Sequence, residues 1–263
     1  MLDYQIKLLE AKIRGVRVDQ LFDTKEGLDT EKTKILNEQI QKLKSGYPLD
    51  YLLGEVEILD LKLIVNEEVL IPRPETEEWL FAFDKIINQT KQNLLVDLGC
   101  GSGIIGLYLS KFYNKAYCVD VSPKAIEVTK DNAVLNNIKN IEFYLSDGLS
   151  DKLLQKNIQK FKSWTLIANL PYLPQSDKTN SRVFKVEHEP DLALYSGQVG
   201  LDLFRKVLVE LETFDIMPIE VIFELDPRNI RIAETLLKNL NYKVNIWEDS
   251  GGFERVLIGI LLQ

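Results

Sequence analysis

Four consecutive residues, Asn169-Leu170-Pro171-Tyr172, have the types and the order needed to hold a planar –NH2 group. The side-chain oxygen of Asn169 and the backbone carbonyl of Leu170 can accept the two N–H bonds of such a group. These acceptors favour a geometry in which the nitrogen lone pair is released for attack. Pro171 biases Leu170 away from the α region and so presets the carbonyl, while Tyr172 can cover the amide plane. The motif suits alkylation of an amide or exocyclic amine nitrogen, although a plain strand followed by a proline turn has the same residue types.

A glycine-rich turn stands between an apolar run typical of a strand and a run typical of a helix. Its residues are Gly99, Cys100, Gly101, Ser102 and Gly103. Glycines let the backbone approach a ligand closely, and the start of a helix offers free N–H donors. This order therefore predicts a site for a nucleotide-like cofactor. Together with Gly106 the turn also fits the G-x-G-x-x-G pattern, so by itself it does not separate NAD from S-adenosylmethionine.

Three acidic residues, Asp97, Asp120 and Asp147, end short apolar runs that are typical of strands. The carboxylate of Asp120 can accept both ribose hydroxyls of a cofactor, and that of Asp147, followed by Gly148, can accept from an adenine amino group. Each acid also suits an ordinary turn after a strand. An acid directly before the glycine turn is more typical of a methyltransferase than of a dehydrogenase, so the set favours S-adenosylmethionine.

The elements that must position these residues follow from the spacing of apolar positions. From residue 75 helices and strands alternate, and strands are expected at Leu94, Ala116, Ile141, Thr165, 219–224, 242–247 and 255–261. Helices are expected at 75–88 and from Ile104, Pro123, Leu201 and Arg228. This alternation predicts an α/β fold, a doubly wound, mostly parallel, Rossmann-like sheet of seven strands with an antiparallel final strand. A ligand should lie over the carboxyl ends of the strands, where the glycine turn and Asn169 fall.

The N-terminal part has a different pattern. Apolar spacing predicts helices at 4–13 and 30–44, the second capped by Asp29 or Thr30, and alternation over 56–65 predicts a β-hairpin. We therefore expect three parts, a helical N-terminal domain (1–48), a β-hairpin linker with the loop that follows it (49–74) and a cofactor-binding domain (75–263).

The composition fits a cytoplasmic enzyme. The 263 residues, 45% of them hydrophobic, can bury an α/β core and a small accessory domain. No apolar run is of membrane-spanning length and no signal-peptide pattern opens the chain, so we expect no membrane contact. Two cysteines, Cys100 and Cys118, fit reduced thiols. With one histidine, His188, and no cysteine pair at ligand spacing, we expect no metal site and no cysteine nucleophile.

The net charge of −8 argues against a nucleic-acid partner, because duplex phosphates attract basic surfaces. The nearest candidates for a basic patch, Lys7, Lys12, Arg14 and Arg17, are typical of an ordinary solvated helix face. We expect no direct specific binding of nucleic acid, and a basic protein domain is the better partner.

The same motifs, in the same order, resemble the HemK/PrmC family of class I S-adenosylmethionine-dependent methyltransferases. The core pattern is Asp97-Leu98-Gly99-x-Gly101-x-Gly103, Asp120, Asp147 and Asn169-x-Pro171-Tyr172. Outside it, Tyr51 to Glu55 and Leu70 to Glu77 resemble the family's linker and the loop that enters its catalytic domain. A later segment matches one that follows the family's Asn-Pro-Pro-Tyr motif, with Glu189-Pro190, Ala193-Leu194, Gly197 and Gly200-Leu201-Asp202. The likeness runs from about Gly46 to the C-terminus.

The resemblance implies a protein glutamine methyltransferase whose partner is a peptide chain release factor. Its target would be the glutamine of the Gly-Gly-Gln motif, and residues 1–48 would recognise the substrate. The implied catalytic residues, which we call the amide clamp, are Asn169, Leu170, Pro171 and Tyr172. The implied S-adenosylmethionine site consists of Asp97, Gly99, Cys100, Gly101, Ser102, Gly103, Asp120, Asp147, Gly148 and Asn169.

The chain departs from the family at three motif positions, and its N-terminal segment is shorter than the family's helical bundle. Leu170 stands where the family usually has its first proline, but it keeps the backbone carbonyl. Gly148 stands where the family tends to have a bulky residue that could lie on adenine, and Glu224-Leu225-Asp226 replaces a pattern ending in glutamine. The alternatives are a glutamine methyltransferase of a ribosomal protein, a nucleic-acid amino methyltransferase, an NAD-dependent oxidoreductase and an inactive cofactor-binding protein.

Overall fold

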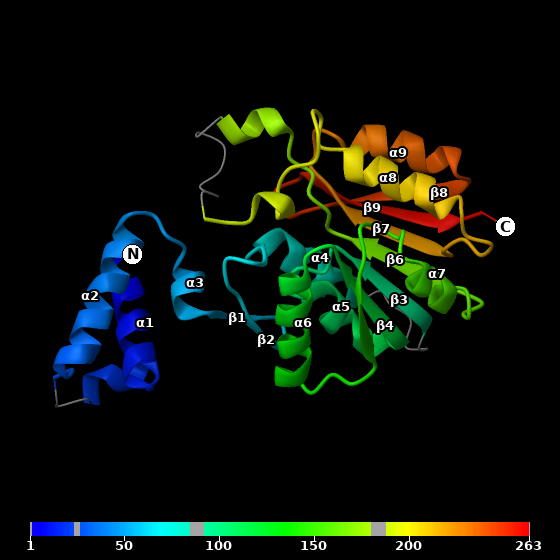
Figure 1. The fold of residues 1–263 in the computed structure, drawn as a ribbon. Coiled ribbons are helices and arrows are strands. Elements are labelled where there is room, and N and C mark those ends of the chain that lie inside the picture. The colour runs from blue at the N-terminus through cyan, green and yellow to red at the C-terminus, as the bar shows by residue number, and fades with distance from the viewer. Residues whose placement is uncertain (1, 24–26, 85–91, 180–187, 263) are drawn as a thin grey trace.

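The computed structural model describes residues 2–23, 27–84, 92–179 and 188–262. Most of these residues form one seven-stranded sheet with helices on both faces (Figure 1). Its strands are β3 (Gln92–Leu98), β4 (Tyr113–Asp120), β5 (Ile141–Leu145), β6 (Trp164–Ala168), β7 (Glu220–Glu224), β8 (Tyr242–Glu248) and β9 (Glu254–Leu261). Its helices are α4 (Pro74–Asp84), α5 (Ile104–Leu109), α6 (Pro123–Leu135), α7 (Lys152–Ile158), α8 (Asp202–Leu211) and α9 (Ile230–Asn239). The predicted doubly wound α/β fold is confirmed.

The strand order β5-β4-β3-β6-β7-β9-β8 places β3 and β6 side by side at the point where the winding reverses. The first five strands pair in parallel, and β9 is antiparallel to both β7 and β8, as expected. In doubly wound sheets ligands bind at such a reversal, over the carboxyl ends of the strands. The glycine turn follows β3 and the amide clamp follows β6, so the topology brings the two motifs together.

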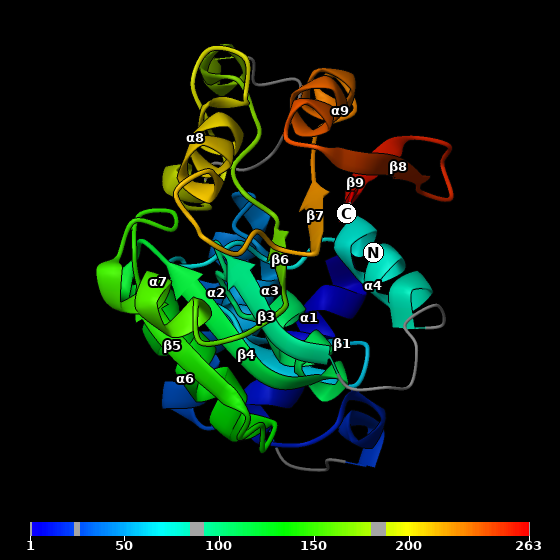
Figure 2. The same ribbon diagram turned by 90° about the vertical axis from the view of Figure 1, so that its right-hand side faces the viewer.

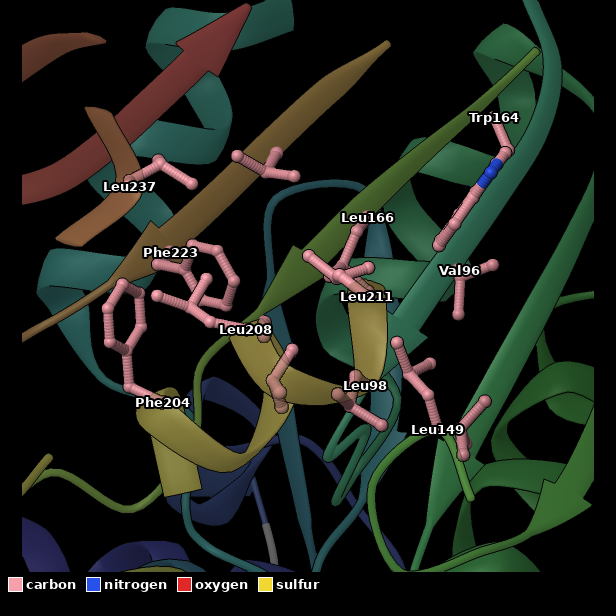
Figure 3. Packing of buried hydrophobic residues seen from close by; sticks show 14 of the residues in the cluster. Val96, Leu98, Leu149, Trp164, Leu166, Phe204, Leu208, Leu211, Phe223 and Leu237 are labelled. Carbon is pink, nitrogen blue, oxygen red and sulfur yellow. The ribbon is translucent and has the colours of Figure 1, made fainter. Parts of the chain in front are cut away.

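Two buried clusters hold the helices to the two faces of the sheet. Helices α7, α8 and α9 pack on one face and α4, α5 and α6 on the other, and Figure 2 shows α8 and α9 opposite α4. Along β3, Val96 and Leu98 face the first cluster and Leu95 faces the second, as the two-residue period of a strand requires. In the first cluster, Phe204 of α8 meets Phe223 of β7 edge to face (Figure 3). A strand buried on both faces explains the continuous apolar run before Asp97.

The N-terminal part is a small group of helices, α1 (Leu2–Arg14), α2 (Thr30–Lys44) and α3 (Leu49–Leu53), with a short 3-10 helix at Val18–Asp23. Asp29 caps α2 by accepting from the Lys32 N–H at 2.8 Å, as predicted. Lys12 of α1 donates to the carbonyl of Leu52 in α3 at 3.0 Å. None of the described helices is long and apolar enough to cross a membrane.

The predicted hairpin, β1 (Glu55–Ile58) and β2 (Leu61–Ile64), lies between these helices and the sheet (Figure 1). Two asparagines four residues apart, one in α6 and one at its C-cap, bind the backbone of β2. Asn132 accepts from the Ile64 N–H at 2.6 Å and donates to the Ile64 carbonyl at 3.0 Å. Asn136 makes the matching pair with Lys62, at 3.1 and 2.8 Å. The hairpin is therefore attached to the helix that follows β4.

Two helices are missing from the sequence prediction, α3 and α7. Both are short, with five and seven residues, and too few turns repeat for apolar spacing to show them. The start of α7 carries a recognisable cap, because Asp151 accepts from the Leu154 N–H at 2.7 Å. The expected end of the helix at 75–88 lies outside the described residues.

Candidate active site

The glycine turn folds back on the end of β4. The N–H groups of Gly99 and Cys100 both donate to the Val119 carbonyl, at 2.8 and 3.0 Å. Gly99, Gly101 and Gly103 have φ values of 73°, 54° and 87°, in the left-handed region that side chains disfavour. A Cβ on Gly101 would meet nothing within 4 Å. The backbone at Gly101 is therefore open to a ligand.

Asp120, at the end of β4, faces this turn. Its Oδ2 accepts from the Gly101 N–H at 3.0 Å and its Oδ1 from the Ser122 N–H at 2.9 Å. Burial raises the pKa of the Asp120 carboxyl, and these backbone N–H groups partly oppose the rise. Each carboxylate oxygen keeps a second lone pair, so two hydroxyls can still be accepted. The structure brings Asp120 to the turn, and its binding of ribose stays a prediction.

Asp97 lies beneath the turn. It is fully buried, and its Oδ2 accepts from the Gly106 N–H of α5 at 2.8 Å. A Cβ on Gly106 would lie 2.8 Å from the same oxygen, so glycine at 106 serves the contact of helix and strand. Burial raises the pKa of Asp97 to about 7. Its Oδ1 is buried and has no hydrogen-bond partner among the described residues, which leaves it for a donor from outside them.

The other two residues of the glycine turn, Cys100 and Ser102, have buried side chains, so they offer mainly their backbone to a ligand. They are 5% and 3% exposed. Burial raises the pKa of the Cys100 thiol, which favours its protonated form. The Ser102 carbonyl accepts from Asn132 at 2.9 Å, so the asparagine that binds β2 also holds the turn. Both cysteines are free thiols in the structure.

Asp147 is the least enclosed of the predicted cofactor residues. It is exposed and pairs with Lys206 of α8 at 2.5 Å. The next residue, Gly148, has φ 70°, and a Cβ on it would lie 2.3 Å from Oε2 of Glu210. The same Glu210 oxygen accepts from the Leu149 N–H at 2.7 Å. A side chain at 148 would be strained by this left-handed backbone and would also displace the Glu210 carboxylate, which gives a physical reason for glycine there.

The amide clamp follows β6. Asn169 Nδ2 donates to Thr76 Oγ1 at 3.3 Å. The Leu170 side chain lies against the glycine turn, since a Cβ on Gly99 would be 2.9 Å from its Cδ2. Burial raises the pKa of Tyr172 well above its ordinary value, so this phenol stays neutral. Clamp and turn are in contact, as their positions after β6 and β3 require.

A later loop supports the clamp from behind. The Leu173 N–H donates to the Leu194 carbonyl, and the Ser196 N–H to the Leu173 carbonyl, both at 2.9 Å. A Cβ on Gly200, whose φ is 79°, would lie 1.9 Å from the Tyr172 carbonyl oxygen. The segment that resembles the family after its Asn-Pro-Pro-Tyr motif is therefore part of the clamp's support.

A second pair of segments is joined by a buried carboxylate. Glu189, 7% exposed, pairs with Arg73 and accepts from the Ile71 N–H at 3.3 Å. It thereby ties the loop ahead of α4 to the segment after the clamp, and both are segments that the resemblance singled out.

The clamp opens into a pocket of about 290 Å³. Its lining combines apolar residues with two arginines and three carboxylates, namely Leu70, Arg73, Glu75, Asn169, Tyr172, Leu173, Ala193, Leu194, Glu224, Asp226 and Arg255. Such a pocket can admit one polar side chain of a protein substrate.

Three residues near the clamp were missed by the sequence analysis as functional residues, Thr76, Trp79 and Glu224. Thr76 Oγ1 and Trp79 Nε1 both donate to Glu224 Oε2, at 2.8 and 2.7 Å. All three are at most 3% exposed. The available signal was weak, because α4 carries several other acids and Glu224 ends its strand, and the sequence gives no reason to join positions about 150 apart.

These residues fit S-adenosylmethionine. The turn offers open backbone at Gly101, Asp120 offers free lone pairs beside it, and the unpartnered Asp97 oxygen suits a donor such as an amino group. Among the described residues, no cluster of three or more His, Cys, Asp or Glu side chains could hold a metal ion.

The fold and the site define a class I, Rossmann-like methyltransferase. The fold is shared with the catalytic domain of hMettl16 in complex with the MAT2A 3'UTR hairpin 6, with a TM-score of 0.60 and 13% identity over 89% of this chain and 83% of that chain. The family described as "MTS: Methyltransferase small domain" matches residues 82–183.

Sequence relatives narrow the class. The release factor glutamine methyltransferase of Deinococcus radiodurans is 31% identical, over 83% of this chain and 76% of the relative. The enzyme of the same name from Flavobacterium psychrophilum is 30% identical, over 95% of this chain and 88% of the relative. The chain belongs to the release factor glutamine methyltransferase family, which confirms the resemblance found in the sequence.

Proposed function

We propose that this methyltransferase transfers a methyl group from S-adenosylmethionine to the side-chain amide of the glutamine in the Gly-Gly-Gln motif of class-1 peptide release factors. One observation carries the proposal. Asn169 lines the pocket with its –NH2 turned to Thr76, and no described residue donates to its Oδ1. That oxygen is therefore available to accept from a substrate amide. The names of the relatives support the choice of substrate.

S-adenosylmethionine supplies an electrophilic methyl group on a sulfonium. The glycine turn and Asp120 would hold it, while Asn169 Oδ1 and the Leu170 carbonyl would accept the two N–H bonds of the substrate amide. A substrate side chain in the pocket would displace water from it, and the neutral ring of Tyr172 would cover the amide. The chain thus supplies alignment and desolvation. No strong general base is required, because the nitrogen loses its proton after it has become cationic.

We also propose that residues 1–48 recognise the release factor, that 49–74 link them to the enzyme and that 75–263 hold the cofactor. The N-terminal helices expose three apolar side chains, Leu2, Tyr4 and Ile35, that a protein partner could cover. A cytoplasmic location remains a prediction from the sequence.

The test is the intact mass of a release factor after incubation with the enzyme and S-adenosylmethionine. We expect a gain of one methyl group, and none in release factor variants with Gln→Ala or Gln→Glu in the Gly-Gly-Gln motif. Faster labelling of purified ribosomal proteins or of nucleic acid would overturn the choice of substrate.

A further inference from the structure

A buried chain of hydrogen bonds runs from α4 through β7 to the clamp. Trp79 Nε1 and Thr76 Oγ1 donate to the same oxygen, Oε2 of Glu224, and Asn169 Nδ2 donates to Thr76 Oγ1. Trp79 and Thr76 are 2% exposed and Glu224 is 3% exposed. The three side chains that adjoin Asn169 are therefore almost entirely shielded from water.

The direction of this chain follows from the two donors that meet Oε2 of Glu224. The indole N–H of Trp79 can only donate, and the Thr76 hydroxyl donates to the same oxygen. Thr76 has a single hydroxyl proton and gives it to that same oxygen. Only lone pairs remain on Thr76 toward Asn169, so the –NH2 of Asn169 must face Thr76 and its Oδ1 must face away.

The orientation of the Asn169 amide decides which substrate group it can meet. With Oδ1 presented, Asn169 accepts from an –NH2 group, as a glutamine side chain requires. If the –NH2 of Asn169 pointed to the substrate instead, it would donate. That orientation suits a carboxylate, but it places the –NH2 of a substrate amide against another –NH2 group. A wrongly paired buried donor is costly, so the orientation separates amide from acid.

We propose that Trp79, Glu224 and Thr76 are positioning residues that fix the orientation of the Asn169 amide and thereby make the site specific for a substrate amide over a carboxylate. The proposal rests on the proposed function, because that function supplies the substrate amide. It goes further by assigning the discrimination between glutamine and glutamate to three side chains behind the clamp.

The first experiment compares Thr76→Val, which has the same shape but no hydroxyl, with Thr76→Ser, which keeps it. Thr235→Val is the matched control, because the exposed Thr235 bonds only within its own helix. Single-turnover methylation of the release factor should fall about tenfold in Thr76→Val, the equivalent of one hydrogen bond, and stay within about threefold in Thr76→Ser. The release factor variant with Gln→Glu should act as an inhibitor, and its inhibition constant should be about tenfold lower for the Thr76→Val enzyme than for the wild-type enzyme. If Thr76 had a purely structural role, Thr76→Val would weaken the binding of the glutamine and the glutamate forms of the release factor equally. The ratio of the two affinities would then stay unchanged.

The second experiment needs no substrate, so it separates failure of this inference from failure of the proposed function. The side-chain –NH2 signal of Asn169 in nitrogen-15 NMR, assigned by its loss in Asn169→Asp, reports exchange with solvent. We expect slow exchange in wild type, Thr76→Ser and Thr235→Val, and exchange at least several-fold faster in Thr76→Val. Trp79→Phe removes the donor-only end of the chain and should shift exchange in the same direction if Thr76→Val does not fold. Unchanged exchange in the folded variants, or an unchanged preference for glutamine over glutamate, would overturn the inference.

Discussion

The glycine turn and the amide clamp differ in how the chain builds them. The turn is held by the two elements that follow it in the chain, because its bonds run to Val119 and Asp120 of β4 and to Thr129 of α6. The clamp is held from both directions along the chain, by Thr76, 93 positions before Asn169, and by the loop around Gly200 after it. The turn thus depends on the adjacent strand and helix, whereas the clamp also depends on a polar partner far away in the sequence.

The largest effect is expected for Asp97→Asn, beneath the glycine turn, and it concerns the pH dependence of the free energy of unfolding. The pKa of Asp97 is raised from 3.8 to about 7 in the folded chain, so its contribution to stability is present below pH 4 and is lost as pH rises through about 7. Asparagine has the same shape and can still accept from Gly106, but it does not titrate. Relative to wild type, Asp97→Asn should gain about 3 kcal/mol between pH 5 and pH 8, measured by urea unfolding. Parallel pH profiles for the two proteins would contradict the buried titration.

The next largest effect tests the clamp, with Asn169→Ala. It removes an acceptor that matters more as the amide nitrogen pyramidalises than when the cofactor is bound alone. Turnover should fall about a hundredfold or more, with a much smaller change in affinity for S-adenosylmethionine. Normal single-turnover methylation by the folded variant would remove Asn169 from the mechanism.

At the cofactor site, Asp120→Ala should weaken the binding of S-adenosylmethionine. It leaves the ribose hydroxyls and two backbone N–H groups without their acceptor, so affinity for S-adenosylmethionine should weaken by about 2 kcal/mol, about 30-fold. Calorimetry measures this, with Asp120→Asn as the control that keeps one acceptor. NAD should not bind to wild type. A folded Asp120→Ala with wild-type affinity would show that the ribose lies elsewhere.

The smallest effect is expected for Leu170→Pro, which keeps the carbonyl of the clamp. No hydrogen bond donated by the Leu170 N–H is found within the described residues. Turnover should therefore stay within a few-fold of wild type in the methylation assay. Loss of activity in a folded Leu170→Pro protein would mean that the leucine side chain against Gly99, rather than the carbonyl alone, positions the clamp.

The same contrast explains what the sequence could predict. The glycine turn, the alternating helices and strands and the antiparallel final strand β9 have local signatures in the sequence. The sheet and the residues around the glycine turn could therefore be predicted from residue types and spacing. The face of the sheet to which Asp97 points could not be predicted. The two-residue period of a strand shows which residues share a face, but it does not show which face carries α5.

The support of the clamp was harder to predict. Thr76 and Glu224 are separated by 148 positions, and only packing of α4 beside β7 reveals their contact. The pairing of Asp147 with Lys206 also depends on how α8 is placed against the end of β5. Whether Asp147 turns to adenine when the cofactor binds stays a prediction.

The contact between Gly148 and Glu210 has an energetic consequence. A side chain at 148 would displace a carboxylate that also binds the Leu149 N–H, so the two positions are coupled through this carboxylate. A larger residue at 148 would need both a change of the left-handed backbone there and a move of the Glu210 carboxylate. Substitutions at 148 and 210 should therefore be non-additive in the free energy of unfolding, so the effect of either one depends on which residue stands at the other position.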